Sequence, residues 1–180
     1  MKQGYVMFKR YLPHYLYDSV SEVDYASLRE SGIKALIFDI DNTLVSYKTL
    51  SAPPGVTRFL RKLRSDGFSV GFVSNNKHER VDVFTKGLGG EFYSHAKARK
   101  PSAKAIRKVI HAMGVTPSET ALIGDQFFTD VIAARRAGLT AILVNPIESS
   151  ETLFFKFKRM AERPFLYKIR KKRKGDSGNS

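Results

Sequence analysis

The sequence predicts an α/β fold in which helices cover both faces of a doubly wound, five-stranded parallel sheet. Short apolar runs alternate along the chain with segments whose apolar residues recur at helical spacing, as they do in folds of this class. Three of the apolar runs end in polar residues, at Asp39, Ser74 and Asp125. Because such sheets bind ligands at the carboxyl ends of their strands, we expect the functional site at that edge.

The five predicted strands are short and mostly apolar. The first has the sequence Ala-Leu-Ile-Phe, and a run without polar residues is typical of a parallel strand that is buried on both faces. The predicted strands span residues 35–38, 68–73, 92–93, 120–123 and 140–144.

The predicted helices are recognised from their apolar spacing and from the residues that end them. In the second helix, Phe59, Leu60 and Leu63 lie at helical spacing, and Gly67 follows as the stop. In the fourth, Ala105 and Val109 share one face. The predicted helices span residues 24–30, 55–66, 79–86, 102–113 and 129–137.

Composition excludes several classes of protein. The chain has 180 residues, 42% of them hydrophobic, which is enough for one domain with a core. Cysteine is absent, so disulfides and thiolate chemistry are excluded and a reducing cytosol fits. No run of about 18 apolar residues is present to span a membrane, and the N-terminus lacks an apolar signal core. We therefore expect a cytoplasmic protein.

The net charge of +14 is concentrated near the C-terminus. Residues 156–174 hold ten lysines and arginines against one acid, Glu162. We therefore divide the chain into a core over residues 1–150, with an aromatic and basic segment at its start, and a basic amphipathic tail over residues 151–180. Such a tail is attracted to anionic lipid or to nucleic acid.

The pair Asp39 and Asp41 directly follows the first strand. Residues two apart on a strand point the same way, so two like charges would lie close together and lose hydration. A divalent cation, a covalent role or both would account for them. Either residue alone would also suit the cap of a turn.

Four motifs in order resemble those of the haloacid dehalogenase superfamily of phosphatases. They are Asp39-x-Asp41-x-Thr43, then Ser74, then Lys100-Pro101, then Gly124-Asp125 followed by Asp130, and the resemblance covers roughly residues 34–145. It implies a Rossmann-like fold and hydrolysis of phosphomonoesters.

The resemblance also implies a role for each motif residue. Asp39 would be the nucleophile that forms an aspartyl-phosphate, and Asp41 the general acid and base. Ser74 would bind phosphate oxygens and Lys100 would balance charge. Mg²⁺ would be held by Asp39, Asp125 and the backbone carbonyl of Asp41, and Asp130 would be either a further ligand or a carboxylate that supports the ligands. The oxygen ligands alone would equally accept Mn²⁺. Without the other motifs, Lys100 would be interpreted as a solvated surface charge. Asp130 would be interpreted as an acidic residue that complements the dipole at a helix N-terminus.

The spacing between motifs leaves no room for a cap domain. Residues 43–74 hold one turn, one helix and one strand, and residues 74–100 hold one helix and a short strand. The resemblance is therefore to the capless subclass III, whose exposed site suits large or surface-bound substrates.

The whole chain is similar to a subclass IIIA branch often called YqeG-like, which is related to mitochondrial phosphatidylglycerophosphate phosphatases. The residues that carry this similarity include Phe8–Pro13, Lys97–Pro101 and Gly124-Asp125-Gln126. The relation implies a lipid head-group phosphatase at the inner face of the membrane. Two alternatives remain open: a phosphatase of a soluble ester or phosphoprotein, and an RNA- or ribosome-binding protein with a vestigial site.

Overall fold

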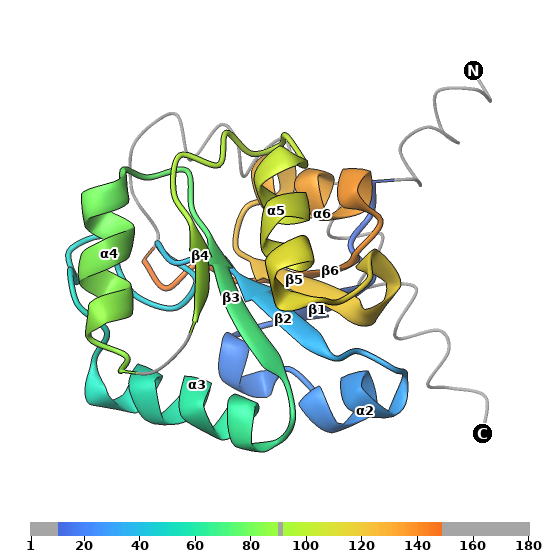
Figure 1. Cartoon of the computed structure of the whole chain (residues 1–180), viewed down its shortest axis with the longest axis horizontal. Helices are drawn as coiled ribbons and strands as arrows, with labels where there is room; N and C mark the ends of the chain where they lie inside the picture. The colour runs from blue at the N-terminus through green and yellow to red at the C-terminus, as the bar shows by residue number, and fades with distance from the viewer. Residues whose placement is uncertain (1–10, 90–91, 149–180) are drawn as a thin grey trace. The chain divides into compact units, whose positions relative to one another are not determined.

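The computed structural model describes residues 11–89 and 92–148, which form a parallel sheet with helices on both faces (Figure 1). The strands are β1 (Tyr15–Tyr17), β2 (Ala35–Phe38), β3 (Ser69–Val73), β4 (Tyr93–His95), β5 (Thr120–Gly124) and β6 (Thr140–Val144). The helices are α2 (Tyr25–Glu30), α3 (Pro54–Ser65), α4 (His78–Lys86), α5 (Lys104–Met113) and α6 (Ile132–Ala137). Short turns η1 (Val20–Glu22), η2 (Pro117–Glu119) and η3 (Phe127–Val131) join them.

The strand order is β1-β6-β5-β2-β3-β4, and every pairing is parallel. The chain runs outward from β2 through β3 to β4 and then crosses back to β5 on the other side of β2. The direction of winding therefore changes between β2 and β5. In open α/β sheets, ligands bind outside the strand ends at such a switch point.

The sheet has six strands, so the prediction of five was wrong in number although the fold class is confirmed. The additional strand, β1, pairs with β6 in the register Tyr15 opposite Ile142. It has three residues at the sheet edge, and Tyr15 is 44% exposed. Such a short edge strand lacks the buried apolar run on which the prediction of strands depended.

Two apolar layers hold the sheet between its helices. On one face, Phe72 meets Phe84 of α4 edge to face at 5.4 Å, within a core that α2 and α3 also enter. On the other, a Cβ at Gly71 would lie 2.6 Å from Met113 Cε and 3.0 Å from Val109 Cγ1, so α5 packs closely against β3 at this glycine. β2 lies at the centre, and its four residues have no exposed surface.

Two predicted helices differ at their N-terminal ends. The helix predicted over residues 129–137 is split into the π-helical turn η3 and α6, because the carbonyl of Gln126 accepts from both Asp130 N (2.9 Å) and Val131 N (3.3 Å). π-turns inside helices are frequent at functional sites. The helix predicted from residue 102 begins instead at Lys104, after a turn in which Ser102 N donates to Arg99 O.

Within the described ranges, the connections of the sheet hold no cap domain. Between β2 and β3 the chain forms one loop and α3, and between β3 and β4 it forms α4. No helix in this part of the chain has the length and apolar character needed to cross a bilayer. The predicted basic tail, residues 151–180, and the first ten residues lie outside the described residues.

Candidate active site

Asp39 and Asp125 follow the two strands that flank the switch point. Asp39 N donates to Ile123 O of β5 at 2.9 Å, which continues the strand pairing by one residue and fixes the carboxylate at the sheet edge. Thr43 links the two acids, because its hydroxyl lies 3.4 Å from Asp39 Oδ2 and 3.2 Å from Asp125 Oδ1. The loop after β2 is thereby tied to the end of β5.

Lys100 is buried between two carboxylates. Its Nζ lies 2.5 Å from Asp39 Oδ1 and 2.6 Å from Asp130 Oδ1, and the lysine is only 7% exposed. Together the two anions raise the pKa of the ammonium despite its burial. Lys100 is therefore a permanent positive charge at the bottom of the site.

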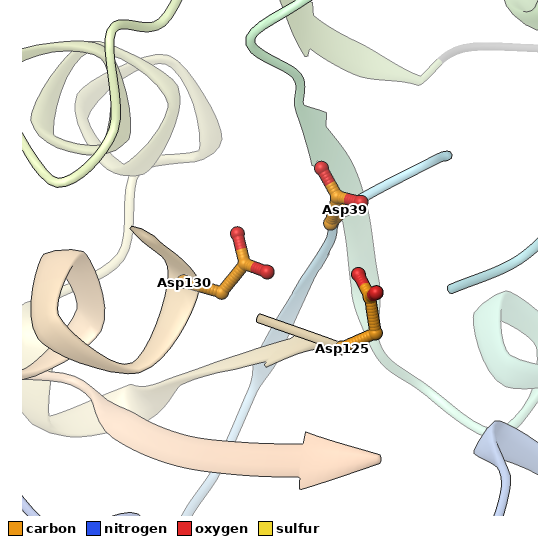
Figure 2. Close-up of side chains that lie close together, drawn as sticks. All are labelled: Asp39, Asp125 and Asp130. Atoms are coloured by element: carbon orange, nitrogen blue, oxygen red, sulfur yellow. The ribbon is translucent and has the colours of Figure 1, made fainter. Parts of the chain in front are cut away.

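The carboxylates of Asp39, Asp125 and Asp130 converge from three elements (Figure 2). One oxygen of each lies within 4.8 Å of the others. Burial is the main cause that raises the pKa of Asp39 to about 7 and that of Asp125 to about 8, and the charge of Asp130 contributes to both shifts. The three acids are brought together at a cost in charge repulsion, which a bound cation would remove.

The donor set fits a hard divalent cation. All three groups offer carboxylate oxygens, the ligands that Mg²⁺ prefers. Asp130 is 1% exposed, and its Oδ1 forms an ion pair with Lys100 Nζ at 2.6 Å. The Asp41 side chain is not part of this cluster. The metal-binding role predicted for Asp41 concerns its backbone carbonyl.

Gly124 allows Asp130 to reach the cluster. A Cβ at Gly124 would lie 2.5 Å from three atoms of the Asp130 side chain, so any larger residue would displace that carboxylate. Asp130 Oδ2 also accepts from Gln126 N at 3.0 Å, across the π-helical turn. The Gly124-Asp125 pair at the end of β5 thus has a steric reason, because the glycine provides the space into which the side chain of Asp130 fits.

Asp41 is held by an arginine from α4. Arg80 contacts Asp41 Oδ1 through Nε at 3.1 Å and Nη2 at 2.9 Å, and it donates to the carbonyls of Leu50 and Thr49 at 2.6 and 2.8 Å. The other oxygen, Oδ2, accepts a single bond from Asn76 Nδ2 at 3.3 Å. Oδ1 is therefore fixed, and Oδ2 remains the more available oxygen.

Two loops at the strand ends are joined through the segment after β3. Ser74 O accepts from Ala98 N at 2.9 Å, and Asn76 O accepts from Lys97 N at 2.8 Å. The Asn75 amide binds the backbone of Lys100 on both sides, accepting from its N–H at 2.7 Å and donating to its carbonyl at 3.3 Å. Asn75 thereby fixes the backbone from which the Lys100 side chain enters the site.

A pocket of about 340 Å³ covers these groups. Its lining residues are Asp39, Asp41, Tyr47, Ser74, Asn75, Asn76, Lys100 and Gln126. Of the six predicted site residues, four line the pocket, and Asp125 and Asp130 lie beside Asp39 in the carboxylate cluster.

Sequence reasoning missed Arg80, Asn75 and Tyr47. Arg80 gave no signal, because a cation on an amphipathic helix is normally solvated. Asn75 lies next to Ser74 at a strand end, and that position was the available clue. Burial and nearby carboxylates raise the pKa of Tyr47 to about 12, so its hydroxyl stays a hydrogen-bond donor.

Comparison with known proteins gives a consistent family. The sequence model of the haloacid dehalogenase-like hydrolases matches residues 45–138. The chain is 34% identical over 164 residues to "Probable phosphatase YqeG" of Bacillus subtilis, covering 91% of this chain and 94% of that protein. It is 27% identical over 151 residues to "Phosphatidylglycerophosphate phosphatase 1, chloroplastic/mitochondrial" of Arabidopsis thaliana, covering 79% of this chain but 43% of the plant protein.

A solved structure agrees with the fold. A HAD phosphatase from Thermococcus onnurineus superposes with a TM-score of 0.52 at 18% identity, over 67% of this chain and 90% of that one. At that identity the likeness supports the arrangement of the sheet and its helices, and the site rests on the geometry above.

Proposed function

Since the chain belongs to the haloacid dehalogenase-like hydrolases and is a phosphatase, we propose that it is a Mg²⁺-dependent phosphomonoesterase. In this proposal it acts through an aspartyl-phosphate on Asp39, and its substrate is phosphatidylglycerophosphate at the inner face of the membrane. The observation that carries the mechanism is the contact of Asp39 with Lys100 at 2.5 Å beside two further buried carboxylates. That arrangement gives a nucleophile, a charge-balancing ammonium and ligands for a cation in one pocket.

In the first half-reaction, a carboxylate oxygen of Asp39 attacks phosphorus and the bond from phosphorus to the ester oxygen breaks. The leaving alkoxide takes a proton from Asp41 Oδ2, whose single partner is the Asn76 amide. Arg80 holds the other oxygen and so keeps the acid at the pocket wall. Lys100 stabilises the negative charge that develops on the phosphoryl group.

In the second half-reaction, Asp41 takes a proton from water, and the hydroxide attacks the aspartyl-phosphate. The bond from phosphorus to the Asp39 oxygen breaks, which releases inorganic phosphate and restores the carboxylate. Ser74, 2% exposed at the end of β3, binds a phosphoryl oxygen in both steps. A bound Mg²⁺, held by Asp39, Asp125, Asp130 and the Asp41 carbonyl, would supply charge neutralisation for the approaching phosphate dianion.

The lipid substrate is supported by three observations. A relative that spans most of this chain is named a phosphatidylglycerophosphate phosphatase. The described part of the chain has no cap domain, so the pocket is accessible to a head group that stays in a bilayer. The sequence of residues 156–174 is strongly basic, which favours an anionic leaflet over a neutral one.

The test is phosphate release from phosphatidylglycerophosphate in mixed micelles and from p-nitrophenyl phosphate, each with Mg²⁺ and with chelator. We expect both activities to require the metal and to fall at least about a thousandfold in Asp39→Asn. The matched control is Asp82→Asn on α4, where an exposed carboxylate is removed with the same change of charge. Loss of activity in the control would point to general electrostatics instead.

The same assay separates the alternatives. Turnover of p-nitrophenyl phosphate without turnover of the lipid would keep the mechanism and assign a soluble ester or phosphoprotein as substrate. Absence of turnover on both, with RNA binding that falls steeply with salt and is unaffected by Asp39→Asn, would favour the nucleic-acid alternative.

A further inference from the structure

The loop that leads to Lys100 alternates between buried and exposed residues. Ala96, Ala98 and Lys100 are buried, whereas Lys97 and Arg99 are exposed. The chain thus points one cation into the pocket and two cations to solvent beside it. The proposed mechanism uses Lys100 alone and leaves the other two without a role.

Lys97 and Arg99 adopt an unfavourable backbone conformation. Lys97 has φ 48° and Arg99 has φ 52°, both in the left-handed region that long side chains rarely occupy. Glycine or asparagine would form the same loop with less strain. Strained residues of this kind cluster where a ligand is held, so the cost indicates that the two side chains are needed where they lie.

A third exposed cation, Lys77, is joined to the same edge of the pocket. Asn76 lines the pocket, its carbonyl accepts from Lys97 N at 2.8 Å, and its side-chain oxygen accepts from Lys77 N at 2.9 Å. Among residues 11–89 and 92–148, no acidic side chain pairs with Lys77, Lys97 or Arg99. We call these three residues the rim cations.

We propose that the rim cations bind a second anionic group of the substrate, next to the phosphate that reacts at Asp39. The ligand class is a phosphomonoester that carries another phosphate-type charge within a few bonds, as a phosphodiester in a lipid head group or as a free bisphosphate. This inference rests on the phosphomonoesterase activity proposed above and adds a specificity subsite to it. Because the subsite lies outside the carboxylate cluster, it affects binding of substrate and not the chemical step.

The test measures inhibition of p-nitrophenyl phosphate hydrolysis by glycerol 3-phosphate and by glycerol 1,3-bisphosphate, a pair that differs in the second anion. In the wild type we expect the bisphosphate to inhibit at least about tenfold more strongly, a difference of about 1.4 kcal/mol. The triple variant Lys77→Gln, Lys97→Gln, Arg99→Gln should lose that preference and keep the kcat for p-nitrophenyl phosphate within about twofold.

The matched control is the triple variant Arg58→Gln, Lys86→Gln, Lys108→Gln. It removes the same charge from exposed positions on α3, α4 and α5 that do not line the pocket. It should retain the preference for the bisphosphate. An equal loss in both triple variants would mean that net charge alone sets affinity, and it would overturn the subsite.

A lipid arm distinguishes the two sources of the second anion. With phosphatidylglycerophosphate in neutral detergent micelles, an increase in KM of about tenfold in the rim variant would assign the second anion to the lipid's own phosphodiester. Retained selectivity for the bisphosphate, with an effect only on vesicles that contain anionic lipid, would show that the rim cations bind the membrane instead. Absence of p-nitrophenyl phosphate hydrolysis in the wild type would refute the proposed function itself.

Discussion

The carboxylate cluster makes the stability of the metal-free protein depend on pH in an unusual direction. The pKa of Asp39 is raised to about 7 and that of Asp125 to about 8, from an ordinary value of 3.8. Between these values the folded protein holds protons that the unfolded chain has released. Stability is therefore greatest at low pH in this window and is lost as pH rises through the folded pKa values.

The magnitude follows from the size of the shifts. Each pH unit inside the window lowers the free energy of unfolding by about 1.4 kcal/mol per group. The ionisation of Asp39 alone therefore lowers it by about 3 kcal/mol between about pH 5 and pH 8. Asp125 would lose about 4 kcal/mol over the same range, but Asp39 contributes to the raised pKa of Asp125, so the sum of about 7 kcal/mol is an upper bound. In a chain of this size, the loss of about 3 kcal/mol from Asp39 alone lowers Tm by roughly 10 °C.

The assay is thermal unfolding in chelator and in Mg²⁺ across that pH range. We expect Tm to fall with pH in chelator, and the stabilisation by Mg²⁺ to grow as the carboxylates ionise. His14 opposes the trend at low pH, because burial and Arg135 lower its pKa. Asp125→Asn controls for this, since it keeps His14 and should flatten the slope. A metal-free Tm that is constant or rises from about pH 5 to pH 8 would refute the reasoning.

Three substitutions test other parts of the site. Lys100→Met removes the ammonium between two buried acids and should lower kcat at saturating Mg²⁺ at least about a hundredfold in steady-state assays. Arg80→Met leaves a buried carboxylate and two carbonyls without their partner and should lower the free energy of unfolding by about 3 kcal/mol, measured with urea. Gly124→Ala should displace Asp130 and weaken Mg²⁺ binding in calorimetric titrations, whereas Gly55→Ala, with nothing within 4 Å of its Cβ, should not.

The sequence predicted the fold class because parallel strands buried on both faces are almost wholly apolar. β2 has no exposed surface, and its four apolar residues predict a buried parallel strand. β1 was not predicted, because its three residues lie at the edge of the sheet and are exposed or only partly buried. Edge pairing is decided by the neighbouring strand, which a local pattern does not contain.

The site was predictable where function places residues at strand ends. Asp39, Ser74 and Asp125 follow β2, β3 and β5, so topology alone brings them to one edge. The ion pair between Arg80 and Asp41 was not predictable, because it depends on how α4 packs against the loop that contains Leu50, 30 residues earlier in the chain. Contacts of that kind arise from tertiary packing and leave no periodic signal.

Charge balance connects the cluster with the rim cations. Three carboxylates against one ammonium leave two negative charges when all are ionised, a field that repels a phosphate dianion. A divalent cation brings the cluster to neutrality and no further, so the attraction that draws an anionic substrate into the pocket must come from elsewhere. Lys77, Lys97 and Arg99 are exposed on the segments that carry the pocket residues Asn76 and Lys100, and they have no acidic partners among the described residues. We therefore propose that the cluster performs the chemistry and that the rim cations select which phosphate esters reach it.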